Sequence, residues 1–130
     1  MSQLPSITRP VKELIDAVDR ADSADLLLDA VRDLAAARDE TAVPKLIEIL
    51  GYNNPGAAVA AVEGLVDIGR PAVVPLLEQL DGYNYGARAW AIRALAGIGD
   101  PRGLKELITG AGDFALSVKR AAARGLGSLQ

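Results

Sequence analysis

The sequence has no cysteine and no histidine, and its 130 residues include only one tryptophan, one phenylalanine and three tyrosines. Without cysteine the chain can form no disulfide, offer no thiolate to a metal and supply no cysteine nucleophile. Without histidine it lacks the side chain that most often acts as a general base near neutral pH. Catalytic mechanisms that need either side chain from this chain are therefore excluded.

Long apolar runs and strong charge are also lacking. No apolar stretch approaches the roughly 20 residues that a membrane span needs, and the N-terminus lacks the apolar core of a signal peptide, so we expect a soluble intracellular protein. Residues 1–65 carry a net charge of −5 and residues 66–130 a net charge of +2. This imbalance is too weak to predict nucleic-acid binding, but the second half could hold a carboxylate-bearing ligand or an acidic partner.

A repeat is the main positive feature of the chain. Leu34, Leu65, Leu95 and Leu126 follow one another at intervals of 31, 30 and 31 residues. Four residues before each leucine stands an alanine, and apolar residues recur three residues before and after it. Spacings of three, four and seven indicate one face of a helix, and the small residues let neighbouring helices approach closely. The chain is therefore predicted to be an array of stacked helix pairs.

The expected boundaries follow from this alignment. We predict one domain over residues 1–130, with an N-terminal helix at about 10–20, repeats at about 24–50, 56–80 and 86–110, and a partial repeat at 117–130. The end of the sequence within a repeat suggests a C-terminal truncation. Ser23 and Thr41 are predicted N-caps. Asn53 and Asn84 are predicted to cap turns, with contact to a ligand as the alternative. Asp100, before Pro101, is predicted to cap the following helix, and the alternative is that its carboxylate binds N–H groups of a ligand.

Two segments resemble a known family. VKRAAARGLG (118–127) and ARAWAIRALAGIGDP (87–101) look like the HEAT-like repeats of phycobilisome lyases, and residues 83–103 resemble the E/F family of bilin lyases, most closely its F-type (beta) subunits. The resemblance implies an all-α, right-handed α-solenoid (superhelix) of HEAT-like helical hairpins. In such arrays the helix equivalent to residues 86–99 usually lines the concave surface.

The resemblance also implies a function. F-type subunits form a heterodimer with an E-type subunit, and the pair binds phycocyanobilin, an open-chain tetrapyrrole, as its substrate. The pair then attaches phycocyanobilin to a cysteine of the phycocyanin alpha subunit through a thioether. The attacking thiol belongs to the acceptor, so the lyase needs no cysteine, no metal and no cofactor. Such a protein would act in the cytoplasm, during phycobilisome assembly.

Trp90 and Arg93 are the leading candidates for binding the bilin or a partner. The equivalents of Trp90 in other repeats are Asp29, Ala60 and Ala121, which suggests a position outside the buried stripe. An indole there could stack on a flat tetrapyrrole or anchor a partner chain, although it could also pack against the neighbouring repeat as a large spacer.

Arginines recur on the same helices. Arg93 belongs to a column with Arg32, Glu63 and Arg124, and Arg88 shares another column with Lys119. Guanidinium groups bind carboxylates through two parallel hydrogen bonds, so these residues could hold the bilin propionates. The alternative is a solvated face, or ion pairs with acidic residues of adjacent repeats.

The remaining candidates are aromatic or acidic. Tyr52, Tyr83 and Phe114 recur every 31 residues, which favours rings that fill the junctions between repeats, although the Tyr83 hydroxyl could reach a ligand. Tyr85 has no aromatic equivalent and is a stronger binding candidate. An acidic cluster near the N-terminus is either a solvated helix face or part of the surface for the E-type subunit; it consists of Asp16, Asp19, Asp22 and Asp25.

Two functions remain open at this point. The first is an enzyme subunit, the F-like half of a bilin lyase that is inactive without its E-type partner. The second is a non-enzymatic scaffold or chaperone of HEAT-like repeats that binds phycobiliproteins. The Trp90 and Arg93 pair favours bilin binding, whereas the lack of histidine and cysteine is compatible with both functions.

Overall fold

The structure is a computed structural model that describes residues 9–80, 82 and 84–110. All regular elements of this part of the chain are helical. In order they are α1 (Val11–Arg20), α2 (Ala24–Ala36), the 3₁₀ turn η2 (Glu40–Ala42), α3 (Val43–Ile49), α4 (Pro55–Ile68), the 3₁₀ turn η3 (Arg70–Ala72), α5 (Val73–Gln79), α6 (Tyr85–Ile98) and α7 (Pro101–Gly110). The predicted partial repeat at 117–130 lies outside the described residues.

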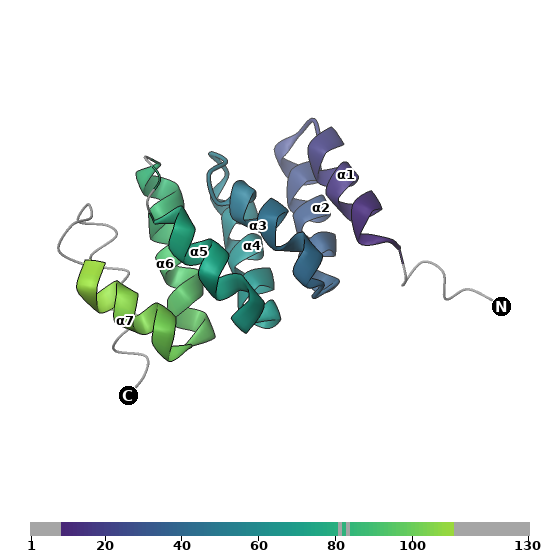
Figure 1. Cartoon of the computed structure of the whole chain (residues 1–130). Coiled ribbons are helices and arrows are strands. Elements are labelled where there is room, and N and C mark those ends of the chain that lie inside the picture. The colour runs from purple at the N-terminus through teal and green to yellow at the C-terminus, as the bar shows by residue number, and fades with distance from the viewer. Residues whose placement is uncertain (1–8, 81, 83, 111–130) are drawn as a thin grey trace.

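The helices stack side by side in chain order, from α1 at one end to α7 at the other (Figure 1). One layer contains α2, α4 and α6, which pack against one another in sequence, and the other contains α3, α5 and α7. Each layer covers the apolar side of the other, which is how an array of short helices buries a continuous core. The predicted α-solenoid of helical hairpins is confirmed.

The packing shows where one repeat ends and the next begins. Among consecutive helices, α1 packs most extensively on α2, α3 on α4, and α5 on α6. The structural hairpins therefore begin one helix earlier than the predicted repeats 24–50, 56–80 and 86–110. This pairing makes α2, α4 and α6 the second helices of their hairpins.

The leucine column forms the centre of the core. Leu34, Leu65 and Leu95 are at most 1% exposed, and the alanine column before them is buried as well. The matching positions of α3 and α5, Leu46 and Leu76, are also fully buried. The predicted inward face of each helix is thus confirmed for the part of the chain that the structure describes.

Glycines set the distance between the helices of the α2–α4–α6 layer. A Cβ atom added at Gly64 of α4 would lie 2.6 Å from the Cβ of Ala35 in α2. One added at Gly97 of α6 would lie 2.7 Å from Cγ2 of Val66 in α4. Real Cβ atoms do not come this close, so both helix contacts depend on the absence of a side chain.

Three equivalent side chains cap the N-termini of this layer. Ser23 Oγ accepts a hydrogen bond from the backbone N–H of Leu26, and Asn54 and Asn84 accept through Oδ1 from the third residue of α4 and of α6. The predictions for Ser23 and Asn84 are confirmed. The prediction for Asn53 is wrong, because α4 and α6 begin 30 residues apart, at Pro55 and Tyr85, so that Asn54 is the equivalent of Asn84.

The other layer starts its helices differently. The predicted cap Thr41 is wrong, because Thr41 donates both its backbone N–H and its hydroxyl to Asp39 Oδ1, at 2.9 and 2.7 Å. Both bonds lower the pKa of Asp39, and the bond from the backbone N–H has the larger effect. Asp39 is therefore the residue that caps the turn η2.

Asp100 caps α7 as predicted and also joins two hairpins. Its Oδ1 accepts from the backbone N–H of Arg102 at 2.9 Å, and its carboxylate pairs with the guanidinium groups of Arg102 at 3.3 Å and Arg70 at 3.4 Å. The Asp100 side chain is only 6% exposed. Hydrogen bonds from Arg102, with the charges of Arg102 and Arg70, lower the pKa of Asp100 below its ordinary value.

None of the helices in residues 9–80, 82 and 84–110 has both the length and the apolar character required to cross a bilayer.

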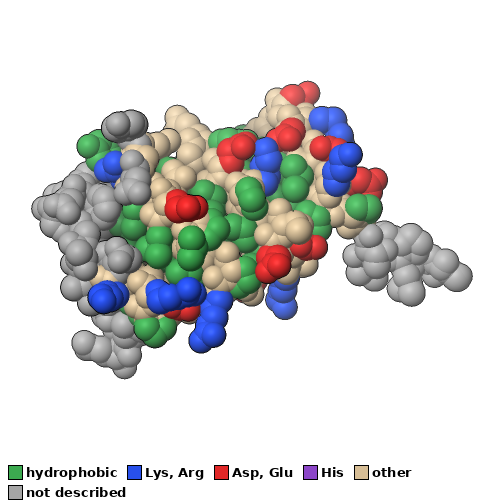
Figure 2. Space-filling model, in the orientation of Figure 1, with side chains coloured by type: hydrophobic (Ala, Val, Ile, Leu, Met, Phe, Trp, Pro, Cys, Tyr) green, Lys and Arg blue, Asp and Glu red, His purple; other side chains and the backbone are tan. Residues whose placement is uncertain are grey.

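Figure 2 shows the face formed by α3, α5 and α7. Lys and Arg gather along one edge of this face, and charges of both signs surround α1.

Substitutions in α4 test the close helix contact. Gly64→Ala is expected to destabilise the fold by about 1–3 kcal/mol because the new methyl group has no space against Ala35. Gly56→Ala in the same helix is the matched control, since its Cβ would meet only ordinary contacts of 3.6 Å or more. It should leave the free energy of unfolding unchanged or raise it by up to about 1 kcal/mol. Urea denaturation measures both, and equal effects of the two variants would contradict the packing described.

The Asp100 carboxylate should make stability depend on pH. Because its pKa is lowered by folding, ionised Asp100 stabilises the fold above the unfolded-state pKa of about 3.9, and this contribution disappears as the pH falls through the folded-state pKa. Asp100→Asn should therefore lower the melting temperature at pH 7 and have a smaller effect near pH 3. Asp67→Asn, in an exposed pair, is the control with the weaker expected effect. A melting-temperature difference that is constant with pH would contradict this assignment.

Candidate functional site

Helix α6 carries two stacked pairs of an arginine and an aromatic ring. The guanidinium carbon of Arg93 lies 4.9 Å from the centre of the Trp90 ring, and that of Arg88 lies 4.8 Å from the centre of the Tyr85 ring. Each pair is separated by three residues, the spacing at which side chains meet on a helix surface. Such contacts favour a fixed position of each ring and cation at the helix surface.

The two pairs lie on different flanks of α6. Arg88 and Trp90 are two residues apart, which corresponds to about 200° around a helix. Trp90 shares its flank with Gly97, seven residues later, and Gly97 packs against Val66 of α4. The Trp90–Arg93 pair therefore faces α4, whereas Tyr85 and Arg88 project from the opposite flank. The candidate residues of α6 are therefore divided between two flanks of the helix.

Trp90 lies at the margin of the buried stripe. Its ring is half-buried and packs against the core, its equivalent Ala60 is buried, and its equivalent Asp29 is exposed. The indole lines a depression of about 320 Å³ between the loop that follows α3 and the start of α6. Trp90 thus packs on the neighbouring hairpin and keeps part of its ring accessible.

Arg32, Glu63 and Arg93 form an exposed row across α2, α4 and α6. Arg32 and Glu63 line a second depression, of about 350 Å³, between α2 and α4, together with Arg38 and Asp67. The predicted arginine column is therefore on the surface, but an acidic residue separates its two described arginines. Arg124, the fourth member, lies outside the described residues, as does Tyr83.

Arg38 has an unusual backbone conformation. Its φ is +51°, and it stands at the end of α2 where the equivalent residues after α4 and α6 are Gly69 and Gly99, with φ of +83° and +73°. A residue with a Cβ pays a steric cost there that glycine does not. The Arg38 side chain lies 3.9 Å from Asp67 across the second depression, and both are largely exposed. The sequence alignment alone could have shown that an arginine replaces glycine here.

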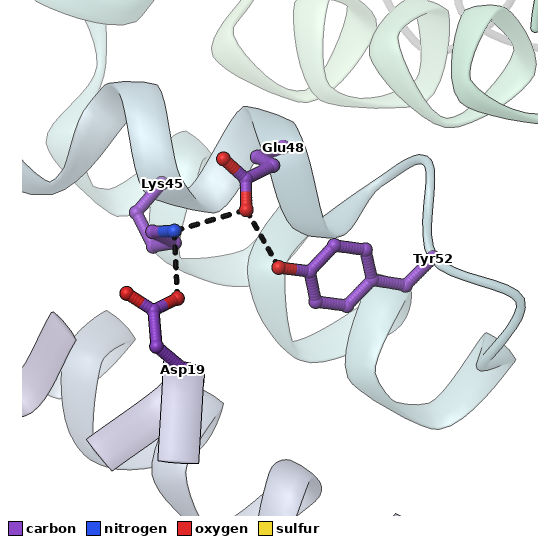
Figure 3. Close-up of polar contacts among 4 residues, drawn as sticks. All are labelled: Asp19, Lys45, Glu48 and Tyr52. Atoms are coloured by element: carbon purple, nitrogen blue, oxygen red, sulfur yellow. Dashed lines mark hydrogen bonds and ion pairs between the residues drawn. The ribbon is translucent and has the colours of Figure 1, made fainter. Parts of the chain in front are cut away.

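A polar network on the opposite layer links α1, α3 and the loop after α3 (Figure 3). Lys45 Nζ donates to Asp19 at 2.8 Å and to Glu48 at 2.9 Å, and the Tyr52 hydroxyl donates to Glu48 at 2.6 Å. Hydrogen bonds from Tyr52 and then from Lys45 lower the pKa of Glu48, and the Glu48 bond raises the pKa of Tyr52. The bonds of Lys45 to Asp19 and Glu48 raise the pKa of Lys45.

Two residues that the sequence singled out, Tyr52 and Asp19, take part in this network. The half-buried ring of Tyr52 packs against the core, in agreement with its predicted role as a structural ring. Asp19, a member of the predicted acidic cluster, forms an ion pair with Lys45 and so links α1 to α3. Phe114, the other equivalent of Tyr52, lies beyond the described residues. In the described part of the chain, no cluster of acidic side chains has the arrangement to hold a metal ion.

The chain is similar to known proteins along almost its whole length. It matches the family of HEAT repeats over residues 11–82 and again over 73–130. It is 62% identical over 125 residues to the phycocyanobilin lyase subunit beta of Pseudanabaena tenuis, which covers 95% of this chain and 44% of that protein. It is also 62% identical over 125 residues to the phycocyanin alpha phycocyanobilin lyase CpcF of Synechocystis sp., covering 95% and 58%.

A solved structure agrees with these matches. A chain in the complex of CpcE and CpcF of phycocyanin lyase from Nostoc sp. PCC7120 is 59% identical to this one and superimposes with a TM-score of 0.64. The match covers 68% of this chain and 53% of that chain. The chain spans about half the length of the curated relatives that it matches. The resemblance to F-type bilin lyase subunits that the sequence indicated is confirmed.

The Arg38 conformation gives a prediction for stability. Relief of the left-handed strain is worth roughly 1–2 kcal/mol, and the extra freedom of glycine in the unfolded chain offsets about 0.4–1 kcal/mol of it. The exposed pair with Asp67 contributes little. Arg38→Gly should thus raise the free energy of unfolding by about 0.5–1 kcal/mol in urea denaturation. Arg32→Gly, within helix α2, is the control and should lower it by about 1 kcal/mol; a destabilised Arg38→Gly would show that the arginine contributes to the fold.

Proposed function

Because the chain belongs to the HEAT-repeat family and is similar over nearly all its length to F-type bilin lyase subunits, we propose that it is the F-like half of a heterodimeric bilin lyase. In this proposal its partner is an E-type subunit, its substrate is phycocyanobilin, and the acceptor is a cysteine of the phycocyanin alpha subunit. The site of action is the cytoplasm, during phycobilisome assembly.

The observation that carries this proposal is the Trp90–Arg93 pair. An accessible indole and a guanidinium 4.9 Å from its centre offer a flat aromatic surface beside a positive charge. A bilin is a flat conjugated molecule with two propionates, so it matches both parts. The equivalent positions of the two preceding hairpins, Asp29 with Arg32 and Ala60 with Glu63, carry no such combination.

The reaction requires little of this chain beyond binding. The acceptor S–H adds across a vinyl-type double bond of the bilin, so that a C–S bond forms and the proton passes to the adjacent carbon. No oxidant or reductant is needed. Holding the two reactants in the right geometry can contribute about 7–11 kcal/mol to lowering the barrier. A chain without cysteine or histidine is therefore suited to a role in orientation, and we assign no catalytic residue within it.

Reconstitution tests this proposal. The chain, an E-type partner, phycocyanobilin and apo-phycocyanin alpha are combined, and mass spectrometry of the acceptor is expected to show an increase equal to one whole bilin. The bilin absorption band should shift and sharpen only when both subunits are present. Trp90→Ala and Arg93→Ala should each lower the attachment rate about tenfold or more, as expected for central binding residues.

Val74→Ala is the control for these variants. Val74 is 52% exposed on α5, in the layer opposite Trp90, so its loss should leave attachment unchanged. A folded heterodimer that leaves the bilin spectrum and the acceptor mass unchanged would contradict the lyase proposal. Binding to phycocyanin alpha without attachment would support the scaffold function in its place.

A further inference from the structure

Among the residues that the structure describes, those that line the depression beside Trp90 are all uncharged. Its polar side chains are those of Tyr52, Asn53, Asn54 and Asn84, next to the Trp90 indole and the backbone around Gly51. The depression between α2 and α4 is different, because Arg32, Arg38, Glu63 and Asp67 all line it. The two depressions therefore suit different chemical groups, and the one at Trp90 suits a neutral group.

Helix capping fixes what the asparagines can offer. Asn54 Oδ1 accepts from the backbone N–H of Ala57 at 3.1 Å, and Asn84 Oδ1 accepts from that of Ala87 at 3.0 Å. An N–H can only bond to an acceptor, so both amide oxygens are committed and the NH₂ groups are left. The NH₂ of Asn84 makes one long bond, of 3.4 Å, to the carbonyl of Gly51 across the depression. The lining therefore presents neutral N–H donors, which pair with a carbonyl oxygen.

Size and charge limit the occupant further. A volume of about 320 Å³ is at the small end of ligand pockets and accommodates a single ring with its substituents, not a whole tetrapyrrole. The Arg93 guanidinium, over the Trp90 ring, places a positive charge about one ring away from this space. The surface thus offers, in order, neutral donors, an aromatic face and a cation.

Resting on the proposed function, we propose that this depression receives a terminal lactam ring of the bilin. A lactam ring is flat and neutral, and its carbonyl is an acceptor for the amides of Asn54 and Asn84. In an open-chain tetrapyrrole the lactam rings are at the ends and the next ring inward carries a propionate, which matches the order of donors, indole and Arg93. This placement puts one end of the bilin at the junction of α4 and α6 and directs the rest of the molecule towards Arg93.

The experiment separates the ring from the propionate by using two probes. Phycocyanobilin and its dimethyl ester are titrated into the heterodimer of this chain and an E-type partner, and binding is followed by bilin absorption. Arg93→Gln should weaken binding of the free acid about tenfold and change binding of the ester little. Asn84→Ser should weaken both probes by the same factor, roughly three- to tenfold, because serine keeps the cap and lacks the amide donor. Trp90→Ala should also weaken both equally.

Controls keep the outcomes distinct. Ser23→Asn is the reverse substitution at the equivalent N-cap, that of α2, which lies away from the depression. It should leave the dissociation constants of phycocyanobilin and of its dimethyl ester unchanged. Circular dichroism confirms that each variant is folded.

The result that would overturn the inference is unaltered binding of both probes by Asn84→Ser and Trp90→Ala in a heterodimer that binds phycocyanobilin. The lyase proposal would survive that result. If these variants instead slow transfer to the acceptor without changing bilin affinity, the depression binds a peptide carbonyl and the lactam assignment is wrong. A wild-type heterodimer that binds neither probe would contradict the proposed function itself.

Discussion

The fold and the candidate site both depend on how closely α4 can approach its two neighbours. At Gly64 and Gly97 there is no space for a methyl group between adjacent helices. The contact of Gly97 with Val66 lies near the C-terminal ends of α6 and α4, and at the other end of α6 the Asn84 amide donates to the carbonyl of Gly51, where the loop after α3 meets Asn84 and Trp90. A wider spacing would keep the helices but separate the side chains that line the depression.

The hairpins share this helical framework and differ from one another at positions on its surface. The buried leucines and alanines repeat almost without change, whereas the marginal positions vary. Trp90 stands where α4 has Ala60, Tyr85 stands where α4 begins with Pro55, and Arg38 stands where the later hairpins have glycine. Each exception is a side chain at the surface of the α2–α4–α6 layer. Side chains that differ in this way are the ones through which an array can recognise a particular ligand.

Much of this could be predicted from the sequence, because helical periodicity determines which face of a helix is buried. The leucine column, the order of the helices and the caps Ser23, Asn84 and Asp100 followed from spacing and residue type. The start of each hairpin did not, since a repeat can be divided at either of its loops and only packing shows which helices pair. Which flank of α6 faces α4 also needed the packing, because it is the contact of Gly97 with Val66 that shows it.

Other features needed the backbone itself. The start of α4 at Pro55, directly after Asn54, decides that Asn54, and not Asn53, is the cap. Whether Thr41 or Asp39 acts as the N-cap depends on the geometry of the 3₁₀ turn η2, in which the Asp39 carboxylate accepts from the Thr41 N–H. The uncharged lining at Trp90 combines residues from the loop after α3 and from the start of α6, so no local pattern in the sequence could have revealed it.

The most direct test uses the fact that Trp90 is the only tryptophan of the chain. The chain is labelled with 5-fluorotryptophan, assembled with an unlabelled E-type partner and examined by ¹⁹F NMR, where it gives one resonance. Our account predicts that this resonance moves as phycocyanobilin is added and stops moving when bilin absorption shows saturation. A resonance that stays in place while the bilin binds would show that the Trp90 surface is not where the ligand lies.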